Sequence, residues 1–160
     1  MKHLYSFTWK KDEYELSRLE MRTFFNFDVA GNVLISEQKI EPSRSPFMRE
    51  RLDIWAQGET IEVLEAFAKG LQLGDKTFKI HCLNNSNDAV EPKLDRKLRN
   101  VLMRSLGMAI DAEPDLEKAD VLLGLVLYND VYYLGELVHG ESVWLHHMKK
   151  PEMYSTALST

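Results

Sequence analysis

The sequence has 160 residues, of which 44% are hydrophobic, so the chain can build a core in one domain or in two small packed units. Its formal net charge of −5 argues against a uniformly basic nucleic-acid binder. No apolar run approaches the roughly 20 residues that span a bilayer, and the first residues lack the apolar core of a signal peptide. We therefore expect a cytoplasmic protein that does not bind membranes.

The first half of the chain predicts the order strand, helix, two strands, helix, strand. The predicted strands cover residues 3–9, 33–40, 47–55 and 77–83. Asp12 is a candidate N-cap for the first helix, in which Leu16 and Leu19 belong to the apolar face, and Thr60 is a candidate cap for the second. This order is that of a ferredoxin-like βαββαβ sandwich. In the last of these strands Cys82 alternates with Phe78, which predicts a small buried hydrophobe.

The second half begins with a polar loop at residues 84–88, and Pro92 suits the first turn of the helix that follows. Leu94, Leu98 and Val101 lie on one side of this helix. The other side gathers basic residues within about 100° and predicts a stripe that faces solvent or a ligand. Its members are Lys93, Arg96, Lys97 and Arg104, with Asn100 between them.

A hairpin is predicted after this helix. Residues 121–128 are apolar on both faces, as expected of a strand that is covered on each side. Asn129 and Asp130 follow, and both residue types tolerate the positive φ that a tight turn requires. Gly124 and Gly135 interrupt the hairpin where a bulge or a close backbone approach is expected.

Charge is distributed unevenly along the chain. Residues 76–104 carry seven basic and three acidic side chains, whereas residues 111–120 carry five acidic ones. Lys and Arg on a rigid helix can follow a phosphate backbone without reading its sequence. The stripe is therefore the candidate RNA-binding surface, although a charged helix face is more often only solvated.

Nothing in the sequence indicates a catalytic centre. It contains no glycine-rich phosphate loop, and Cys82 has no adjacent base to activate it. The side chains of His146 and His147 diverge because the two residues are adjacent, and the other histidines fall on separate strands, so we expect no metal site. Together with Lys149 and Lys150, these two histidines predict a polar, partly basic exit from the last strand.

Three stretches resemble the THUMP domain of tRNA-modifying enzymes. They are T-F-K-I-H at residues 77–81, the basic helix with its continuation I-D-A-E-P-D at residues 110–115, and Y-Y-L-G-E-L-V at residues 132–138. The order resembles the guanosine-N2 tRNA methyltransferases in particular, where a similar hairpin leads through a basic segment with a proline and a T-A-L-like stretch into the catalytic domain. Here that stretch is residues 155–158.

The resemblance implies an α+β fold in which a ferredoxin-like N-terminal unit packs on a THUMP-like α/β unit. We expect a ferredoxin-like domain at residues 1–75, a THUMP-like RNA-binding domain at residues 76–151, and a linker at residues 152–160 to a catalytic domain outside this sequence. The implied role is to grip the acceptor arm and 3′ end of tRNA by shape, so that the other domain modifies a base.

The residues expected to contact phosphate are Lys93, Arg96, Lys97, Arg99 and Arg104, with Lys149 and Lys150 as secondary candidates. The sequence lacks the Asp/Asn-Pro-Pro-aromatic motif and the cofactor loop of the methyltransferases. We therefore expect no catalysis and no cofactor in this part of the protein. S-adenosylmethionine is implied only for the methyltransferase domain in cis.

Two alternatives remain open at this point. The same module would serve a thiouridine or pseudouridine synthase, which carries a different catalytic domain. A ferredoxin-like module that binds a small metabolite or a protein is the alternative outside the RNA class. A deep apolar pocket near Tyr128 and Tyr132, with no basic surface, would favour that second alternative.

Overall fold

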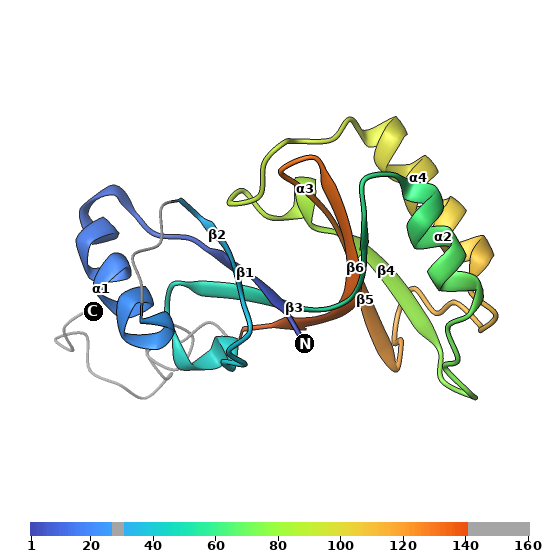
Figure 1. The fold of residues 1–160 in the computed structure, drawn as a ribbon, viewed down its shortest axis with the longest axis horizontal. Helices are drawn as coiled ribbons and strands as arrows, with labels where there is room; N and C mark the ends of the chain where they lie inside the picture. Colours follow the sequence, from blue (N-terminus) through green and yellow to red (C-terminus); the bar gives the residue numbers. More distant parts are fainter. Residues whose placement is uncertain (27–30, 141–160) are drawn as a thin grey trace, which may run out of the picture.

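The computed structural model describes residues 1–26 and 31–140, and one sheet forms its centre. The strands are β1 (His3–Phe7), β2 (Val33–Ser36), β3 (Met48–Gly58), β4 (Phe78–Cys82), β5 (Val121–Tyr128) and β6 (Val131–His139). They form a six-stranded sheet in the order β2-β1-β3-β6-β5-β4 (Figure 1). Every pair is antiparallel except β4 with β5, which is parallel. The predicted α+β class is confirmed.

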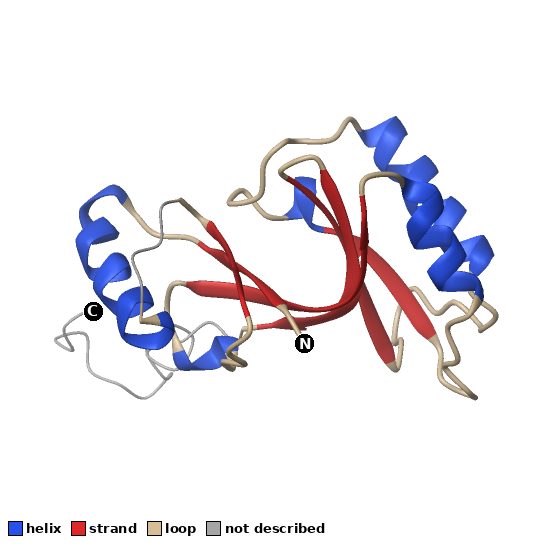
Figure 2. Cartoon of the chain, in the orientation of Figure 1, coloured by secondary structure: helices blue, strands red, loops and turns tan. Residues whose placement is uncertain are grey.

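Helices pack on the sheet, and the three longest of those described lie toward its two ends (Figure 1). The helices are α1 (Tyr14–Phe25), α2 (Ile61–Lys69), α3 (Leu83–Ser86) and α4 (Arg96–Ala109), with short 3-10 turns η1 (Lys11–Glu13) and η2 (Pro42–Arg44). Figure 2 shows α1 at one end and the pair α2 and α4 at the other. Among the described helices, none has the length and apolar character needed to cross a membrane.

Strand β3 joins the two ends of the molecule. Its first part pairs with β1, and it pairs with β6 from Glu50 to Gly58 with an irregularity between Ile54 and Ala56. Because β3 runs for eleven residues, the chain leaves it well past β1, and β4 then forms beside β5. The first half of the chain therefore has the predicted element order of a βαββαβ sandwich. Its four strands do not form a separate sheet, because β4 pairs with β5 of the second half and not with a strand of the first half.

Hydrophobic side chains form three clusters. The cluster beneath α1 combines Tyr5 and Phe7 of β1 with Met21 and Phe25 of the helix. The cluster beneath α2 and α4 includes Leu64, Ala68, Phe78, Cys82, Leu102, Leu106, Leu123 and Leu134. A third cluster, on the other face of the sheet, includes Leu4, Leu52, Leu83, Val126 and Leu137. In β1, β5 and β6, alternate residues therefore face different clusters, as the pleat requires.

The predicted domain boundary at residue 75 stays a prediction, but the packing of helix α2 is relevant to it. That boundary assigns α2 to the first unit. In the structure, Leu64 and Ala68 of α2 share a cluster with Leu102 and Leu106 of α4, so α2 packs with the second unit.

The hairpin between β5 and β6 agrees with its prediction in detail. Asn129 and Asp130 have φ values of 49° and 61°, which suit a tight two-residue turn. Gly124 lies opposite Gly135 in the register. A Cβ atom at Gly135 would overlap the carbonyl oxygen of Asp53, so the expected close backbone approach is present.

The predicted apolar faces of two helices are partly wrong. Leu16 and Leu19 of α1 are 60% and 59% exposed, because Met21 and Phe25 are the residues that meet the aromatic rings of β1. In α4 the buried residues are Leu102 and Leu106, whereas Leu98 and Val101 are 46% and 57% exposed. Each helix is thus rotated relative to its predicted orientation.

The start of α4 also differs from the prediction. The helix begins at Arg96 rather than near Pro92, and the side chain of Asp95 caps it by accepting a hydrogen bond of 3.2 Å from the backbone NH of Lys97. The predicted loop at residues 84–88 overlaps the single turn α3, which begins one residue earlier, at Leu83. Cys82 is 4% exposed, which confirms it as a small buried residue.

Candidate nucleic-acid interface

Helix α4 displays most of the predicted basic residues to solvent. Arg96, Lys97 and Arg104 are exposed on the helix, and Lys93 is exposed just before it. We call these four residues the basic stripe. The helix itself is fixed by Leu102 and Leu106, which are buried against the sheet. The geometry therefore suits contacts with a regular array of negative charges.

Arg99 differs from the other four predicted residues. It is half-buried and close enough to the end of β4 to act on His81. Burial is the main cause that lowers the pKa of His81; the negative charge of Glu50 opposes this shift, and the positive charge of Arg99 adds a smaller contribution to it. The side chain of Arg99 is thus less exposed than the four residues of the basic stripe.

The position of Lys93 is set by the connection that precedes α4. Its Nζ donates a hydrogen bond of 2.7 Å to the backbone carbonyl of Asn87. The side chain amide of Asn87 in turn donates to Ser6 Oγ and to Glu50 Oε2, at 2.6 Å each. Lys93 is therefore linked through Asn87 to β1 and β3.

Glu50 is the buried centre of this network. It is 4% exposed, and its Oε1 lies 3.2 Å from Nδ1 of His139. Burial raises the pKa of Glu50, but hydrogen bonds from His139 and Asn87 outweigh burial and hold the pKa below its ordinary value. The carboxylate thus fastens the connection before α4 to the central strands.

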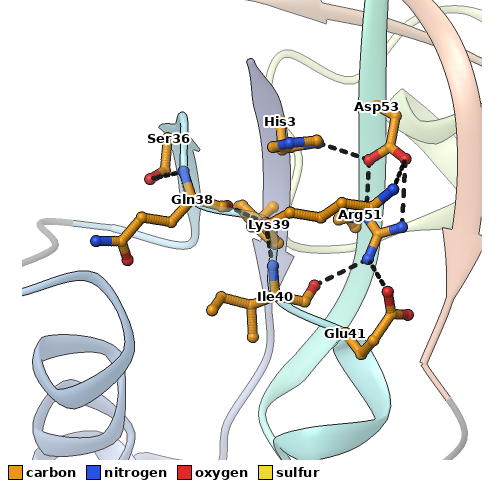
Figure 3. Close-up of polar contacts among 9 residues, drawn as sticks. His3, Ser36, Gln38, Lys39, Ile40, Glu41, Arg51 and Asp53 are labelled. Carbon is orange, nitrogen blue, oxygen red and sulfur yellow. Dashed lines mark hydrogen bonds and ion pairs between the residues drawn. The ribbon is translucent and has the colours of Figure 1, made fainter. Parts of the chain in front are cut away.

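A second buried network holds the segment before η2 (Figure 3). The guanidinium of Arg51 donates to Asp53 at 2.7 and 3.2 Å and to Glu41 at 2.8 Å. Nδ1 of His3 lies 2.6 Å from Asp53 Oδ1. Burial raises the pKa of Asp53, but Arg51 and His3 outweigh it, so this pKa is lowered overall. His3, Arg51 and Asp53 are buried and paired, whereas Glu41 is exposed, and together these groups hold β1, β3 and residues 36–41 in place.

Sequence reasoning missed both networks because their members are far apart in the chain. His3 and Asp53 are fifty positions apart, and Ser6 and Asn87 are eighty-one apart. The sequence signal was a charged residue at an inward position of a strand, as with Glu50 and Arg51. Such a buried charge needs a partner, but the alternation of residues along the strand does not indicate which residue that partner is.

The surface of α4 also carries exposed apolar side chains, two of which, Leu98 and Val101, were predicted to lie on the apolar face of the helix. Leu98, Val101 and Met108 are exposed, at 46%, 57% and 79%. Ser105 lies between them on the helix surface, and its hydroxyl donates to Glu65 of α2. This apolar side of α4 thus borders both the basic stripe and helix α2.

A hollow of about 320 Å³ lies between the two ends of the molecule. Asn32 and Val33 at the start of β2 line one part of it, and Tyr128 at the end of β5 lines another. The remaining wall is the connection between α3 and α4, through Asp88, Ala89 and Glu91. Figure 1 shows this connection bending toward the start of β2.

Several predicted features lie outside the described residues. They are Lys149, Lys150, the two adjacent histidines and the linker at residues 152–160. Within residues 1–26 and 31–140, no group of three or more His, Cys, Asp or Glu side chains is arranged to hold a metal ion.

No family model matches the chain, and no curated protein matches it in sequence. Solved structures do match its fold. TrmN from Thermus thermophilus has a TM-score of 0.57 at 13% identity, over 88% of this chain and 46% of that one. The fold is THUMP-like.

Two further structures give the same result. A 4-thiouridine synthetase, solved in complex with RNA and with bound ATP, has a TM-score of 0.55 at 13% identity, over 87% of this chain and 42% of that one. PH1313 from Pyrococcus horikoshii Ot3 has a TM-score of 0.55 at 11% identity, over 87% and 55%. The chain thus spans about half the length of these structures. At these identities the matches show the fold alone.

Proposed function

We propose that this chain is the tRNA-binding portion of a tRNA-modifying enzyme. The observation that carries the proposal is the basic stripe on α4, presented on a fold that is shared with a synthetase solved in complex with RNA. The stripe contacts phosphates of the acceptor arm, and a separate domain in cis carries out the modification. This division of labour suits a surface of fixed shape, because RNA helices offer phosphates more readily than base edges.

The enzyme class within this proposal is an S-adenosylmethionine-dependent methyltransferase that works in the cytoplasm. The support for it is the resemblance of residues 77–158 to the guanosine-N2 enzymes, together with the fold shared with TrmN. In this proposal Lys149 and Lys150 contact RNA as well or orient the catalytic domain. Arg99 contributes less than the other predicted residues, because it is half-buried.

The likeness to the thiouridine synthetase supports a second candidate, in which the same module serves that chemistry. Its tRNA-binding role is unchanged, and only the catalytic domain differs. The metabolite-binding alternative has less support, since the hollow beside Tyr128 is bordered by two carboxylates and the chain does carry a basic surface.

Charge reversal within the basic stripe tests the proposal. The variant Lys93→Glu, Lys97→Glu, Arg104→Glu should weaken tRNA binding by at least tenfold at about 0.1 M salt. Its log-log salt slope should become shallower by roughly one unit for each phosphate that the variant no longer neutralises. Fluorescence anisotropy with labelled tRNA, repeated over a range of salt concentrations, measures both quantities.

The matched control reverses three exposed lysines that lie outside the basic stripe, namely Lys2, Lys10 and Lys11. It changes the net charge by the same amount and should weaken binding much less. Equal weakening in the two variants would mean that only the total charge matters, and α4 would not be the interface.

A further inference from the structure

The hollow between the two ends of the molecule is chemically unlike the basic stripe, although the two are adjacent. Glu91 lines the hollow and is two positions from Lys93 in the chain. The ammonium group of Lys93 is bonded to the carbonyl of Asn87, whose next residue, Asp88, also lines the hollow. The ammonium group of Lys93, which can bind a phosphate, is thus held beside a hollow whose lining does not favour one.

The lining disfavours a phosphate and suits a flat group with hydrogen-bond donors. Asp88 and Glu91 are exposed carboxylates, which repel phosphate and accept hydrogen bonds. Val33 and Ala89 are buried and give an apolar surface, and Tyr128 adds a half-buried aromatic ring. Aromatic rings stack on nucleobases of any kind, and carboxylates accept hydrogen bonds from the amino group of cytosine.

The size of the hollow is also informative. Its volume of about 320 Å³ is at the lower end of the roughly 300–1,000 Å³ that is usual for small-molecule sites. A single base with part of its ribose is therefore a better match than a large cofactor.

We propose that this hollow binds one unpaired nucleobase that carries an exocyclic amino group, and that it prefers cytosine to uracil. The inference rests on the proposed function, because the RNA backbone is held by the basic stripe while the base enters the hollow. Lys93 holds the phosphate next to that base. Cytosine and uracil differ at one edge, where cytosine has an amino donor and uracil a carbonyl acceptor, so the carboxylates distinguish them.

The test uses two RNA octamers, one of cytidines and one of uridines, titrated against the whole chain by fluorescence anisotropy at one salt concentration. The cytidine octamer should bind about fivefold or more tightly than the uridine octamer. Equal affinities, or tighter binding of uridine, would overturn the inference.

Neutral variants separate base recognition from general repulsion. Asp88→Asn with Glu91→Gln should abolish the preference for cytidine, because amides no longer present only acceptors. Asp111→Asn with Glu113→Gln, in the exposed acidic loop after α4, removes the same charge and should leave the preference intact. If the first pair of substitutions raises affinity for both octamers by the same factor and keeps their ratio, the carboxylates only repel RNA and the inference fails.

Tyr128 provides the stacking test. Tyr128→Ala should weaken cytidine binding by about tenfold, whereas Tyr128→Phe, which keeps the ring, should bind as the parent does. Thermal unfolding identifies any loss of fold in the alanine variant, and the phenylalanine variant then carries the comparison. Weak binding by both variants would assign the effect to the hydroxyl and contradict stacking.

Binding of tRNA, measured in parallel, distinguishes failure of the base site from failure of the proposed tRNA-binding function. If tRNA binds with a strong salt dependence and the octamers bind equally, only the base site is wrong. If tRNA does not bind at all, the proposed function fails, and the base site fails with it.

Discussion

At the scale of single residues, β3 carries three buried charged side chains, those of Glu50, Arg51 and Asp53. The side chain of Arg51 is 4% exposed, and its guanidinium bonds two carboxylates, of Asp53 and Glu41. A buried charge whose partner is removed loses its compensation and destabilises the fold strongly.

We expect Arg51→Met to lower the free energy of unfolding by about 3 kcal/mol, measured by urea denaturation, because it leaves Asp53 buried without its main partner. The control is Lys39→Met. Lys39 lies 3.5 Å from the same carboxylate, but its side chain is 57% exposed, so its removal should cost less than about 1 kcal/mol. Similar destabilisation by both variants would contradict the special role of the buried pair.

The pKa directions of two carboxyl groups predict how stability depends on pH. The pKa values of Asp53 and Glu50 lie below their ordinary values of 3.8 and 4.5. Each carboxylate therefore contributes stability that is present above its ordinary pKa and is lost as pH falls through the lowered value in the folded protein.

The free energy of unfolding should thus decrease as the pH falls below about 4.5, and Glu50→Gln should make that decrease shallower. Urea denaturation at a series of acidic pH values measures it. The control is Glu113→Gln, at an exposed carboxylate for which the same removal of charge should leave the slope unchanged. A Glu50→Gln slope identical to the parent's would mean that Glu50 titrates alike in the folded and unfolded chains.

At the scale of elements, the sequence specifies the hairpin better than it specifies the helices. A turn such as Asn129-Asp130 depends on local backbone preferences, which the residue types carry. The face that a helix buries depends on the surface it meets. The rotation of α4 follows from the sheet residues beneath Leu102 and Leu106, and the rotation of α1 from the rings of Tyr5 and Phe7. Those partners are distant in sequence, so periodicity alone does not identify them.

A substitution at Gly135 tests how closely β3 and β6 must approach each other in the central part of the sheet. Gly135→Ala should destabilise the protein by more than about 2 kcal/mol, since its Cβ would overlap the backbone of β3 at Asp53. Gly70→Ala is the control, because a Cβ there meets only the carbonyl of Phe67 at 3.6 Å. Urea denaturation of both variants compares them, and a tolerated Gly135→Ala would show that β3 and β6 separate easily.

At the scale of the whole molecule, one sheet connects the end that holds α1 to the end that holds the basic stripe. The sequence predicted the strands and their order along the chain, because alternation and turn residues are local signals. It did not predict that β4 joins β5, since strand pairing is decided by contacts between distant segments. For the same reason the stripe was predictable from one helix, whereas the hollow, built from residues 31–33, 88–91 and Tyr128, was not.

The measurement that most directly tests the account is the binding of this chain to tRNA with an intact 3′ end and to tRNA trimmed of its terminal nucleotides, each titrated with salt. We predict tight binding that weakens on trimming, with a log-log salt slope of roughly −3 for about four phosphate contacts. Weak and equal binding to both tRNAs, with little salt dependence, would contradict an acceptor-end grip and leave the basic stripe as a solvated helix face.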